Sequence, residues 1–395
     1  MVCPQGVLSS NRFLARVGRI CRVGVSTGRQ GTSRCPPGRF KSGERVRCNA
    51  EDFTTAAGKS SLDVVEWSED FNNHYTLGTE VAVGSFGKVW RGRERTTGDP
   101  VAVKRIKMQQ GTPHTEEVRE KVDREVAVLK QLQGHRGIAK LHGCLLHERN
   151  YSLVTDFYSG KDLRANVKLW GPISEGLCAA VAWEVLAVLR HCREARVVHG
   201  DVKAANFMVA SGACNPFRNS DIRELPAGWM KAVDFGEGRY LRGGTTDELR
   251  GRCGTLVYMA PEVLLGCYGF PADMWSAGIM MFFMLSGRYP WWERTEVALR
   301  QNLRQVQEAV CCQPLRIDPE AVGNPSPSCM DLLSRLLVRE SNLRMTLEQA
   351  EAHPFFEENL AICENGTVIL GSDSNKPSAS IAELCPVRWA IEGMS

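Results

Sequence analysis

With 395 residues, 43% of them hydrophobic and 24% charged, the chain can bury a sizeable core. This composition excludes a collagen-like chain, a wholly disordered chain and a small disulfide-dense scaffold. The formal net charge of +4 hides an uneven distribution. Residues 1–48 carry ten Lys and Arg and one acid, Glu44, which gives this end +9 and leaves −5 for the remaining 347 residues. Overall basicity therefore gives no reason to expect a nucleic-acid partner.

The fifteen cysteines do not form a pattern typical of a metal site or a redox-active dithiol. No two have the C-x-x-C spacing, and only Cys311 and Cys312 are neighbours, whereas zinc ribbons and thioredoxin-type sites need close pairs. We therefore expect free thiols in a reducing compartment. The longest apolar run, Ala277–Leu285, is about half of what a membrane-spanning helix needs, so no integral membrane segment is expected.

The first 43 residues contain no acid and are rich in Ser, Thr, Gly and Arg. Organelle transit peptides have this composition, and residues 46–50 (VRCNA) are similar to plastid cleavage sites. Arginines at positions 12, 16, 19 and 22 recur at a helical spacing that suits a mitochondrial presequence instead, and an ordinary basic tail is a third interpretation. We expect residues 1–48 to be a disordered plastid transit peptide, with a mitochondrial one as the alternative, and residues 49–74 to be an acidic linker.

A strand, a glycine-containing turn and a second strand are predicted over residues 77–106. Gly84 and Gly87 would let backbone N–H groups approach a phosphate without interference from side chains. The sequence VAVK, at residues 101–104, ends in Lys104, 17 residues after Gly87. Two glycines three residues apart more often mark an ordinary β-turn, so the turn alone carries little weight.

Residues 115–133 are predicted to form a helix with a single apolar stripe. The stripe consists of Val118, Val122, Leu129 and Leu132. Glu125 lies on the same stripe, and a carboxylate on an apolar face is costly unless a cation lies nearby. Lys104 is the candidate partner. The alternative is a partly exposed acid at the edge of the stripe.

Two polar segments follow an apolar helix that is predicted to begin after Ser174, its N-cap. The first is HGDVKAAN at residues 199–206, and the second is VDFG at residues 233–236. Further along, GTLVYMAPE occupies residues 254–262. Together with VAVK, these segments resemble the motifs of protein kinases, whose catalytic loop reads H-R-D-L-x-x-x-x-N and is followed by D-F-G and A-P-E.

The resemblance covers about residues 75–356 and implies an α+β, bilobal protein kinase fold. Residues 75–156 would form a small lobe of five β-strands and one regulatory helix. Residues 157–356 would form a larger, mainly helical lobe, in which Arg344 is the expected ion-pair partner of Glu262. Residues 357–395 would be a disordered C-terminal tail.

The implied activity is transfer of the γ-phosphate of Mg-ATP to Ser or Thr hydroxyls of protein substrates. Lys203, two residues after Asp201, and Thr255, ahead of A-P-E, are typical of the Ser/Thr branch. The sequence GFPADMW at residues 269–275 is similar to that of calcium-dependent and calmodulin-dependent kinases. The residues after Phe356 contain no D-x-D-x-D-G loop, so we do not expect this chain to bind calcium itself.

The resemblance also implies roles for the polar residues. Asp201 would accept the proton of the substrate hydroxyl, and Lys203 would steady the γ-phosphate. Asn206 and Asp234 would ligate Mg²⁺. The other catalytic positions are Lys104, Glu125 and Thr255, whose hydroxyl is expected to bond to Asp201 and Lys203. The residues expected to bind ATP are Val81, Ala82, Val83, Gly84, Ser85, Phe86, Gly87, Lys88, Val89, Ala102, Lys104, Met208 and the gatekeeper Thr155.

Three departures from the kinase pattern modify these expectations. Ala82 replaces the first glycine of the glycine-rich loop, which should stiffen that loop. Gly200 replaces the arginine that in many kinases couples activity to a phosphate on the activation loop, so we expect activity without this phosphorylation. The gap of 28 residues from Asn206 to Asp234 is long, and residues 211–228 are expected to be an extended hairpin tip on the surface.

Two other functions stay open on the sequence. A catalytically weak pseudokinase scaffold is suggested by Ala82 and Gly200. A redox-regulated organelle kinase would use Cys253, or the vicinal pair Cys311 and Cys312, although neighbouring cysteines are poorly placed for an unstrained disulfide. The sequence does not indicate an oligomeric state, and a monomer is the simplest expectation.

Overall fold

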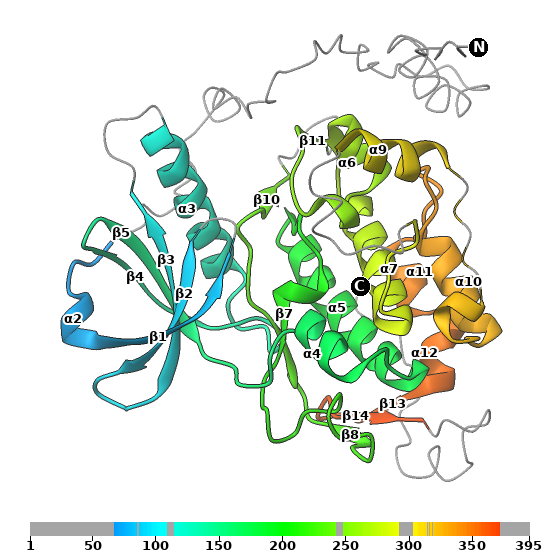
Figure 1. The fold of residues 1–395 in the computed structure, drawn as a ribbon, viewed down its shortest axis with the longest axis horizontal. Coiled ribbons are helices and arrows are strands. Elements are labelled where there is room, and N and C mark those ends of the chain that lie inside the picture. Colours follow the sequence, from blue (N-terminus) through cyan, green and yellow to red (C-terminus); the bar gives the residue numbers. More distant parts are fainter. Residues whose placement is uncertain are drawn as a thin grey trace, which may run out of the picture.

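The computed structural model describes residues 67–84, 87–108, 114–241, 248–291 and 303–371, apart from residues 314, 316 and 318. Within these ranges the chain forms a small β-rich lobe and a larger helical lobe, connected by the segment between β5 and α4 (Figure 1). The predicted α+β, bilobal architecture is confirmed. The predicted transit peptide, residues 1–48, lies outside the described ranges.

The small lobe is built on an antiparallel sheet of five strands in the order β1-β2-β3-β5-β4. Side chains of β3 alternate between two apolar clusters, with Val101 and Val103 on one face and Ile106 on the other. Lys104 shares the face of Ile106, which packs towards helix α3. The strands are β1 (Tyr75–Val83), β2 (Lys88–Glu94), β3 (Pro100–Lys107), β4 (Leu141–His147) and β5 (Asn150–Asp156).

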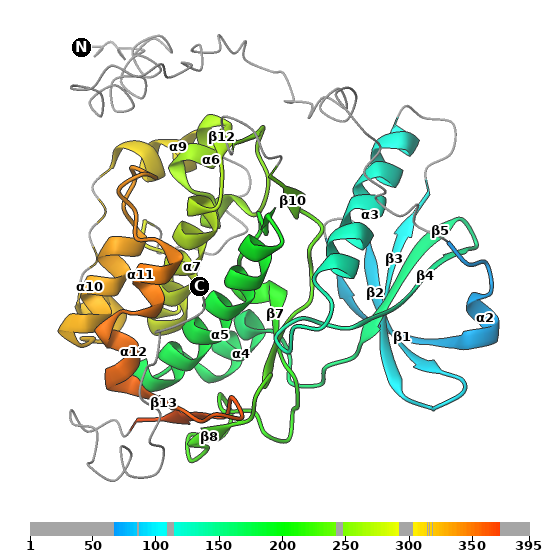
Figure 2. The same cartoon turned by 180° about the vertical axis from the view of Figure 1, so that it is seen from behind.

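Helix α3 (His114–Gln131) lies beside the sheet on the side that faces the large lobe (Figures 1 and 2). Its ends agree with the predicted range to within two residues, which is the usual uncertainty of a helix boundary. The predicted apolar stripe is buried at Val122, Leu129 and Leu132, and Glu125 on that stripe is only 3% exposed. The stripe therefore fixes which face of α3 turns inward and carries Glu125 with it.

The predicted linker is wrong over residues 67–74, which belong to the small lobe. The Trp67 ring lies 4.9 Å from the ring of Tyr151, and Ser68 exchanges backbone hydrogen bonds with β4. Helix α2 (Phe71–His74) then places Phe71 against β1, where it is 3% exposed. The prediction was wrong because acids surround these aromatic residues, so the composition of the segment is that of a polar linker.

The large lobe is organised around α5 (Glu175–Glu194) and α7 (Pro271–Ser286), which pack against each other. Ser174 accepts a hydrogen bond from the Leu177 amide, which confirms the predicted N-cap. The apolar run of α7 is buried on all sides, as expected of a central helix. No helix of the described ranges is long and apolar enough to cross a membrane. The other α-helices described in this lobe are α4 (Leu163–Trp170), α6 (Pro261–Leu265), α9 (Leu303–Cys312), α10 (Pro327–Leu336), α11 (Leu347–Glu351) and α12 (Pro354–Asn359).

Pairs of short strands hold the segments that carry the kinase-like motifs. Strand β6 pairs with β10 just before residue 199, and β7 pairs with β9 directly after residue 206. Residues 199–206 and the Asp234 segment are thereby fixed between two small antiparallel ladders. The strands are β6 (Val197–Val198), β7 (Phe207–Val209), β9 (Met230–Ala232), β10 (Arg239–Tyr240), β11 (Leu249–Arg250) and β12 (Cys267–Tyr268), with β11 paired to β12.

The predicted disordered tail is wrong over residues 357–371. Strands β13 (Leu360–Ile362) and β14 (Val368–Leu370) form a hairpin, and β14 also pairs with β8 (Glu224–Leu225). Val368 and Leu370 are buried against the large lobe, so the segment is held by apolar burial as well as by strand pairing. Residues 372–395 lie outside the described ranges.

The pairing of β8 also corrects the expectation for residues 211–228. Instead of an exposed hairpin tip, this insertion buries Asn215, Phe217 and Leu225, which are 6%, 8% and 1% exposed. The Asn215 amide donates to the Gly160 carbonyl and to Asn166 Oδ1, at 3.1 and 2.8 Å. The insertion therefore connects the C-terminal hairpin with the start of α4.

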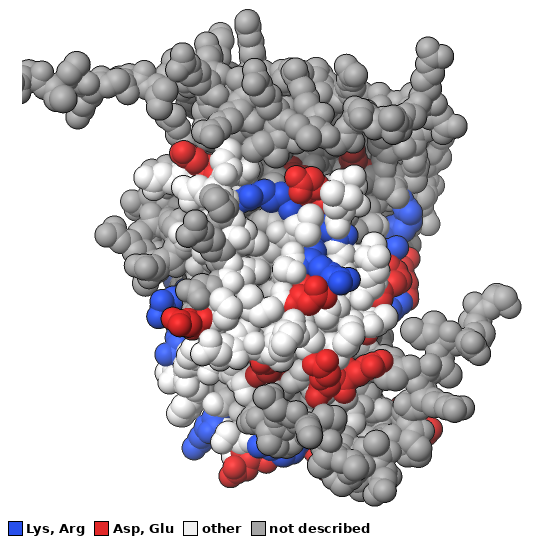
Figure 3. All heavy atoms as spheres, turned by 90° about the vertical axis from the view of Figure 1, so that its right-hand side faces the viewer, with Lys and Arg blue, Asp and Glu red and all other residues white. Residues whose placement is uncertain are grey.

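Charged side chains are interspersed on the face of the large lobe shown in Figure 3. Lys and Arg alternate there with Asp and Glu, and the area between them is uncharged. This described face presents no single-sign patch that would attract a polyanion.

Candidate active site

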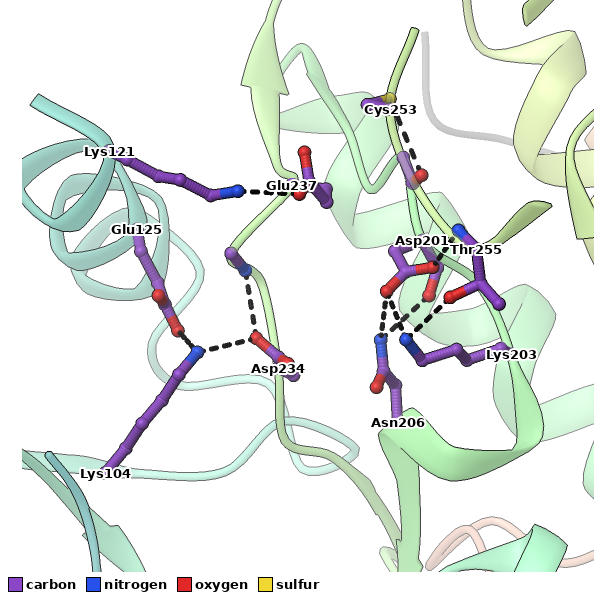
Figure 4. A network of polar contacts seen from close by, with 12 residues as sticks. Lys104, Lys121, Glu125, Asp201, Lys203, Asn206, Asp234, Glu237, Cys253 and Thr255 are labelled. Atoms are coloured by element: carbon purple, nitrogen blue, oxygen red, sulfur yellow. Dashed lines mark hydrogen bonds and ion pairs between the residues drawn. The ribbon is translucent and has the colours of Figure 1, made fainter. Parts of the chain in front are cut away.

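Lys104 contacts carboxylates from both lobes. Its Nζ donates to Glu125 Oε1 at 2.6 Å and to Asp234 Oδ1 at 2.9 Å (Figure 4). The predicted pairing of Lys104 with Glu125 is confirmed, and the second contact places the D-F-G segment against β3 and α3. Asp234 keeps 36% of its side chain exposed, so its carboxylate remains accessible to a ligand.

The charges of this cluster stabilise one another. Burial alone would lower the pKa of Lys104, but the nearby Asp234 and Glu125 carboxylates outweigh it and raise this pKa above its ordinary value. Partial burial likewise opposes ionisation of Asp234, yet the Lys104 charge and hydrogen bonds from Lys104 and the Gly236 amide lower its pKa well below the usual range. At neutral pH Lys104 is an ammonium and Asp234 a carboxylate.

The Asp201 carboxylate is held by three neighbours. Lys203 Nζ donates to its Oδ2 at 2.5 Å, and the Thr255 amide donates to its Oδ1 at 2.8 Å. Asn206 Nδ2 donates to the Asp201 carbonyl at 2.9 Å and to its side chain at 3.2 Å. Asp201 is thus fixed in orientation, as a positioned proton acceptor requires.

The predicted role of Thr255 is half right. Its hydroxyl accepts a hydrogen bond from Lys203 Nζ at 2.8 Å, as expected, but its backbone amide rather than its hydroxyl contacts Asp201. Gly254 has φ +89°, and a Cβ there would lie 2.4 Å from the Gly200 carbonyl. A glycine before Thr255 is therefore needed to bring this amide to Asp201.

Asp273 holds the backbone of the catalytic loop, a role that was not predicted from the sequence. It stands in the first turn of α7, is 4% exposed, and accepts hydrogen bonds from the His199 and Gly200 amides at 2.8 and 2.9 Å. The buried His199 ring lies 4.8 Å from the Phe235 ring. An acid at the start of an otherwise apolar helix was the available signal, since such a carboxylate needs donors.

The residues expected to bind ATP lie mainly on β1, β2 and β3. Strand pairing places Ala82 opposite Val89, Val89 opposite Lys104, and Ala102 opposite Thr155. The Gly84 amide donates to the Gly87 carbonyl at 2.8 Å, which closes the turn between β1 and β2.

Other members of the expected ATP-binding set are placed differently. Met208 is on β7 of the large lobe and is half-buried. Val81 and Val83 are exposed, and Lys88 forms a surface ion pair with Glu80 at 2.7 Å. The predicted residues Ser85 and Phe86 lie outside the described ranges.

Arg344 and Glu262 form the predicted ion pair. Arg344 Nη2 donates to Glu262 Oε2 at 2.9 Å, and its Nη1 donates to Glu262 Oε1 at 2.5 Å and to the Pro271 carbonyl at 2.6 Å. The Arg344 side chain has no exposed surface, so the pair is structural and anchors α6 to the lobe.

The residues present fit a magnesium-nucleotide. Asn206 gives its amide hydrogens to Asp201, and its oxygen points away from that residue (Figure 4). A carboxylate and an amide oxygen are the hard ligands that Mg²⁺ accepts. Mg²⁺ in nucleotide sites is usually held by one or two protein ligands together with waters and substrate phosphate oxygens, so two protein ligands are sufficient.

Cys253 does not have the properties of a redox sensor. It is 5% exposed, its Sγ lies 2.9 Å from the Tyr268 hydroxyl, and burial raises the pKa of its thiol to about 12. A reactive cysteine needs an accessible thiolate, and this thiol stays protonated at neutral pH. The observation speaks against the redox interpretation at this residue.

The small lobe contributes Lys104 and Glu125 to this site. The large lobe contributes a loop with an aspartate, a lysine and an asparagine, and a second aspartate, Asp234. Protein kinases have this arrangement. The comparison with protein families agrees, because residues 75–356 match the family model described as "Protein kinase domain". The chain belongs to the protein kinase family.

Among curated proteins the chain is similar to plant kinases. It is 30% identical over 291 residues to "Calcium-dependent protein kinase 1" of Oryza sativa subsp. japonica, covering 74% of this chain and 52% of the relative. It is 31% identical over 302 residues to "CDPK-related kinase 3" of Arabidopsis thaliana, covering 74% of this chain and 46% of the relative. The chain thus spans about half the length of these relatives.

Proposed function

We propose that this chain is an active protein kinase that transfers the γ-phosphate of Mg-ATP to Ser or Thr hydroxyls of protein substrates. The observation that carries the proposal is the completeness of the polar site. Lys104, Glu125 and Asp234 form one connected cluster, and Asp201 and Asn206 form another. A scaffold that had lost catalysis would have no need to keep both.

Each residue has a role that its contacts support. Asp201 accepts the proton of the substrate hydroxyl as the oxygen bonds to the γ-phosphorus and the bond to the β-phosphate oxygen breaks. Lys203, beside Asp201, stabilises charge on the transferred group. Lys104 would bind the nucleotide phosphates, and Asn206 and Asp234 would hold Mg²⁺, which would supply positive charge to the phosphates.

The test is phosphate transfer by the full chain. We expect incorporation of label from γ-labelled ATP into Ser and Thr of a general acceptor protein in the presence of Mg²⁺, and none with Asp234→Asn. The variant should keep the thermal unfolding midpoint of the wild type to within a few degrees, which shows that it is folded. A wild-type chain that binds nucleotide but transfers no phosphate would contradict the proposal and favour the pseudokinase scaffold.

We propose further that calcium does not switch this chain directly. The relative from Oryza sativa is named calcium-dependent, but the sequence of this chain has no D-x-D-x-D-G loop. The rate of phosphate transfer should therefore be equal in excess Ca²⁺ and in a calcium chelator, with Mg²⁺ held constant. A change of tenfold or more would contradict this.

We also propose that residues 1–48 direct the protein to plastids. The support is compositional, namely ten basic residues, one acid and a cleavage-like segment near Cys48. Residues 1–60 fused to a fluorescent protein should enter plastids of plant cells, and a fusion of residues 49–395 should stay outside. Mitochondrial fluorescence would favour the alternative address, and diffuse fluorescence would contradict import.

A further inference from the structure

One face of α3 contacts the D-F-G segment at three successive points. Lys121, Glu125 and Val128 stand at positions i, i+4 and i+7, so their side chains lie on the same face of the helix. The middle contact is the Glu125–Lys104–Asp234 cluster of the site. The other two are not part of that cluster.

The first additional contact is an ion pair. Lys121 Nζ donates to Glu237 Oε1 at 2.7 Å, and the two side chains are only 24% and 15% exposed (Figure 4). Glu237 directly follows Gly236. Its position is therefore tied through the backbone to Asp234, three residues earlier.

The second additional contact is a close approach of backbone to helix. A Cβ on Gly238 would lie 3.2 Å from Val128 Cγ1 and 3.0 Å from the Phe235 carbonyl. A side chain here would require Val128 or the backbone to shift by a few tenths of an ångström, so glycine favours this close packing on α3. Residues 234–238 thus follow one face of α3 for two helical turns.

The same segment also packs directly on the catalytic loop. Gly200 has φ +74°, and a Cβ there would lie 2.8 Å from the Glu237 carbonyl and 3.1 Å from Cys253 Sγ. The neighbouring residues Arg239 and Tyr240 pair with Val198 and Val197. A side chain at position 200 would therefore be strained in this conformation, and its Cβ would meet residue 237 and Cys253.

We propose that the Lys121–Glu237 ion pair is a positioning contact that holds α3 in the catalytically competent orientation without phosphorylation of the activation segment, which is the part of the chain between D-F-G and A-P-E. This inference rests on the proposed kinase activity. Both partners are encoded side chains, so the contact needs no modification. Because Glu237 moves with Asp234, the pair couples the orientation of α3, and hence of Glu125, to the placement of Asp234.

The test compares phosphatase-treated full chain with variants of the pair. Glu237→Gln and Lys121→Met should each lower kcat/KM for ATP by about tenfold, with a matching loss of affinity for a fluorescent, non-hydrolysable ATP analogue. They should also speed amide hydrogen exchange in residues 114–131. Glu237→Asp should retain part of the activity, and the exchanged pair Lys121→Glu with Glu237→Lys should regain most of it.

Arg119→Gln is the matched control. It removes a charge and an ion pair with Asp123, at 3.5 Å, from the same helix, but that pair does not touch the D-F-G segment. We expect wild-type kinetics to within about twofold, as for other exposed helix pairs.

Two results would overturn the inference. One is wild-type kinetics and hydrogen exchange in both single variants, and the other is loss of wild-type activity on phosphatase treatment. A wild-type chain without any phosphate transfer would instead contradict the proposed function. In that case nucleotide affinity and hydrogen exchange of α3 would still decide whether the pair positions the helix.

Discussion

Helix α3 and the β13–β14 hairpin both hold segments that lead to Asp234, but with contacts of opposite chemistry. Charged groups carry most of the attachment of helix α3 to residues 234–238: Lys121 bonds directly to Glu237, and Glu125 is connected to Asp234 through Lys104. The hairpin holds β8, whose chain continues into β9 and Asp234, through strand pairing and buried apolar side chains such as Val368 and Leu370. One attachment is electrostatic and partly exposed, and the other is apolar and closed to water.

The difference indicates which attachment can respond to a signal. An ion pair that keeps some contact with water changes strength with salt, with bound phosphate and with competing charges. Apolar burial is not weakened by competing charges or by moderate changes in salt in this way. We therefore expect the small-lobe attachment to control activity and the hairpin to control stability.

The largest expected effect is loss of catalysis with stability retained. Asp201→Asn removes the proton acceptor but leaves an oxygen that can still accept from the Thr255 amide. We expect kcat to fall by about 10²- to 10⁴-fold, while the free energy of unfolding changes by less than about 1 kcal/mol. Steady-state kinetics and urea unfolding of the same preparation measure both. A variant that lost activity only because it had unfolded would break the comparison.

The opposite result, a loss of stability with catalysis retained, is expected in the sheet formed by β8, β13 and β14. Leu225 is 1% exposed and lies opposite Val368 across the β8–β14 pair, so Leu225→Ala leaves a cavity. We expect the free energy of unfolding to drop by about 2–4 kcal/mol, with kcat within about twofold of the wild type at a temperature where the variant is folded. Leu343→Ala, at a leucine that is 70% exposed, is the control and should change stability by less than about 0.5 kcal/mol.

The contrast between the two regions also explains what the sequence could predict. Asp201, Lys203 and Asn206 stand within six residues, and the resemblance of this short segment to the catalytic loop of protein kinases predicts the loop residue by residue. Lys104 and Glu125 are farther apart in the sequence. Their pairing is still predicted, because an acid on an apolar stripe is costly unless a cation lies nearby. No local sequence pattern predicts the pairing of β8 with β14, because two short apolar strands can pair with many partners.

Lys121 and Glu237 were not predicted as site residues, although the sequence contains a signal for both. Lys121 stands one turn before Glu125 on α3, and Glu237 directly follows D-F-G, so two opposite charges lie beside residues that the sequence already assigns to the site. The contact of the Thr255 amide with Asp201 could not have been predicted, because it depends on the left-handed backbone of Gly254 and not on any side chain.

The smallest expected effect is on the free energy of unfolding and comes from a buried carboxyl group, that of Glu184. Glu184 on α5 is 2% exposed, and its Oε1 has no hydrogen-bond partner among the described residues. Burial raises the pKa of this carboxyl to about 6, against the opposing charges of Arg136 and Lys231. A carboxyl whose pKa is raised on folding binds its proton more tightly in the folded state. Its penalty is therefore absent at low pH and grows as the pH rises from about 4.5 to 6.

Glu184→Gln removes that penalty. Relative to the wild type, the variant should be more stable by up to about 2 kcal/mol above pH 6.5, with no gain near pH 4. Urea unfolding of both proteins from pH 4 to 8 gives the difference directly. A gain that does not depend on pH would mean that packing, not charge, limits stability at this position. A loss at pH 7.5 would mean that the ionised carboxylate is stabilised by Arg136 and Lys231, and that electrostatic contacts support the large lobe as they do α3.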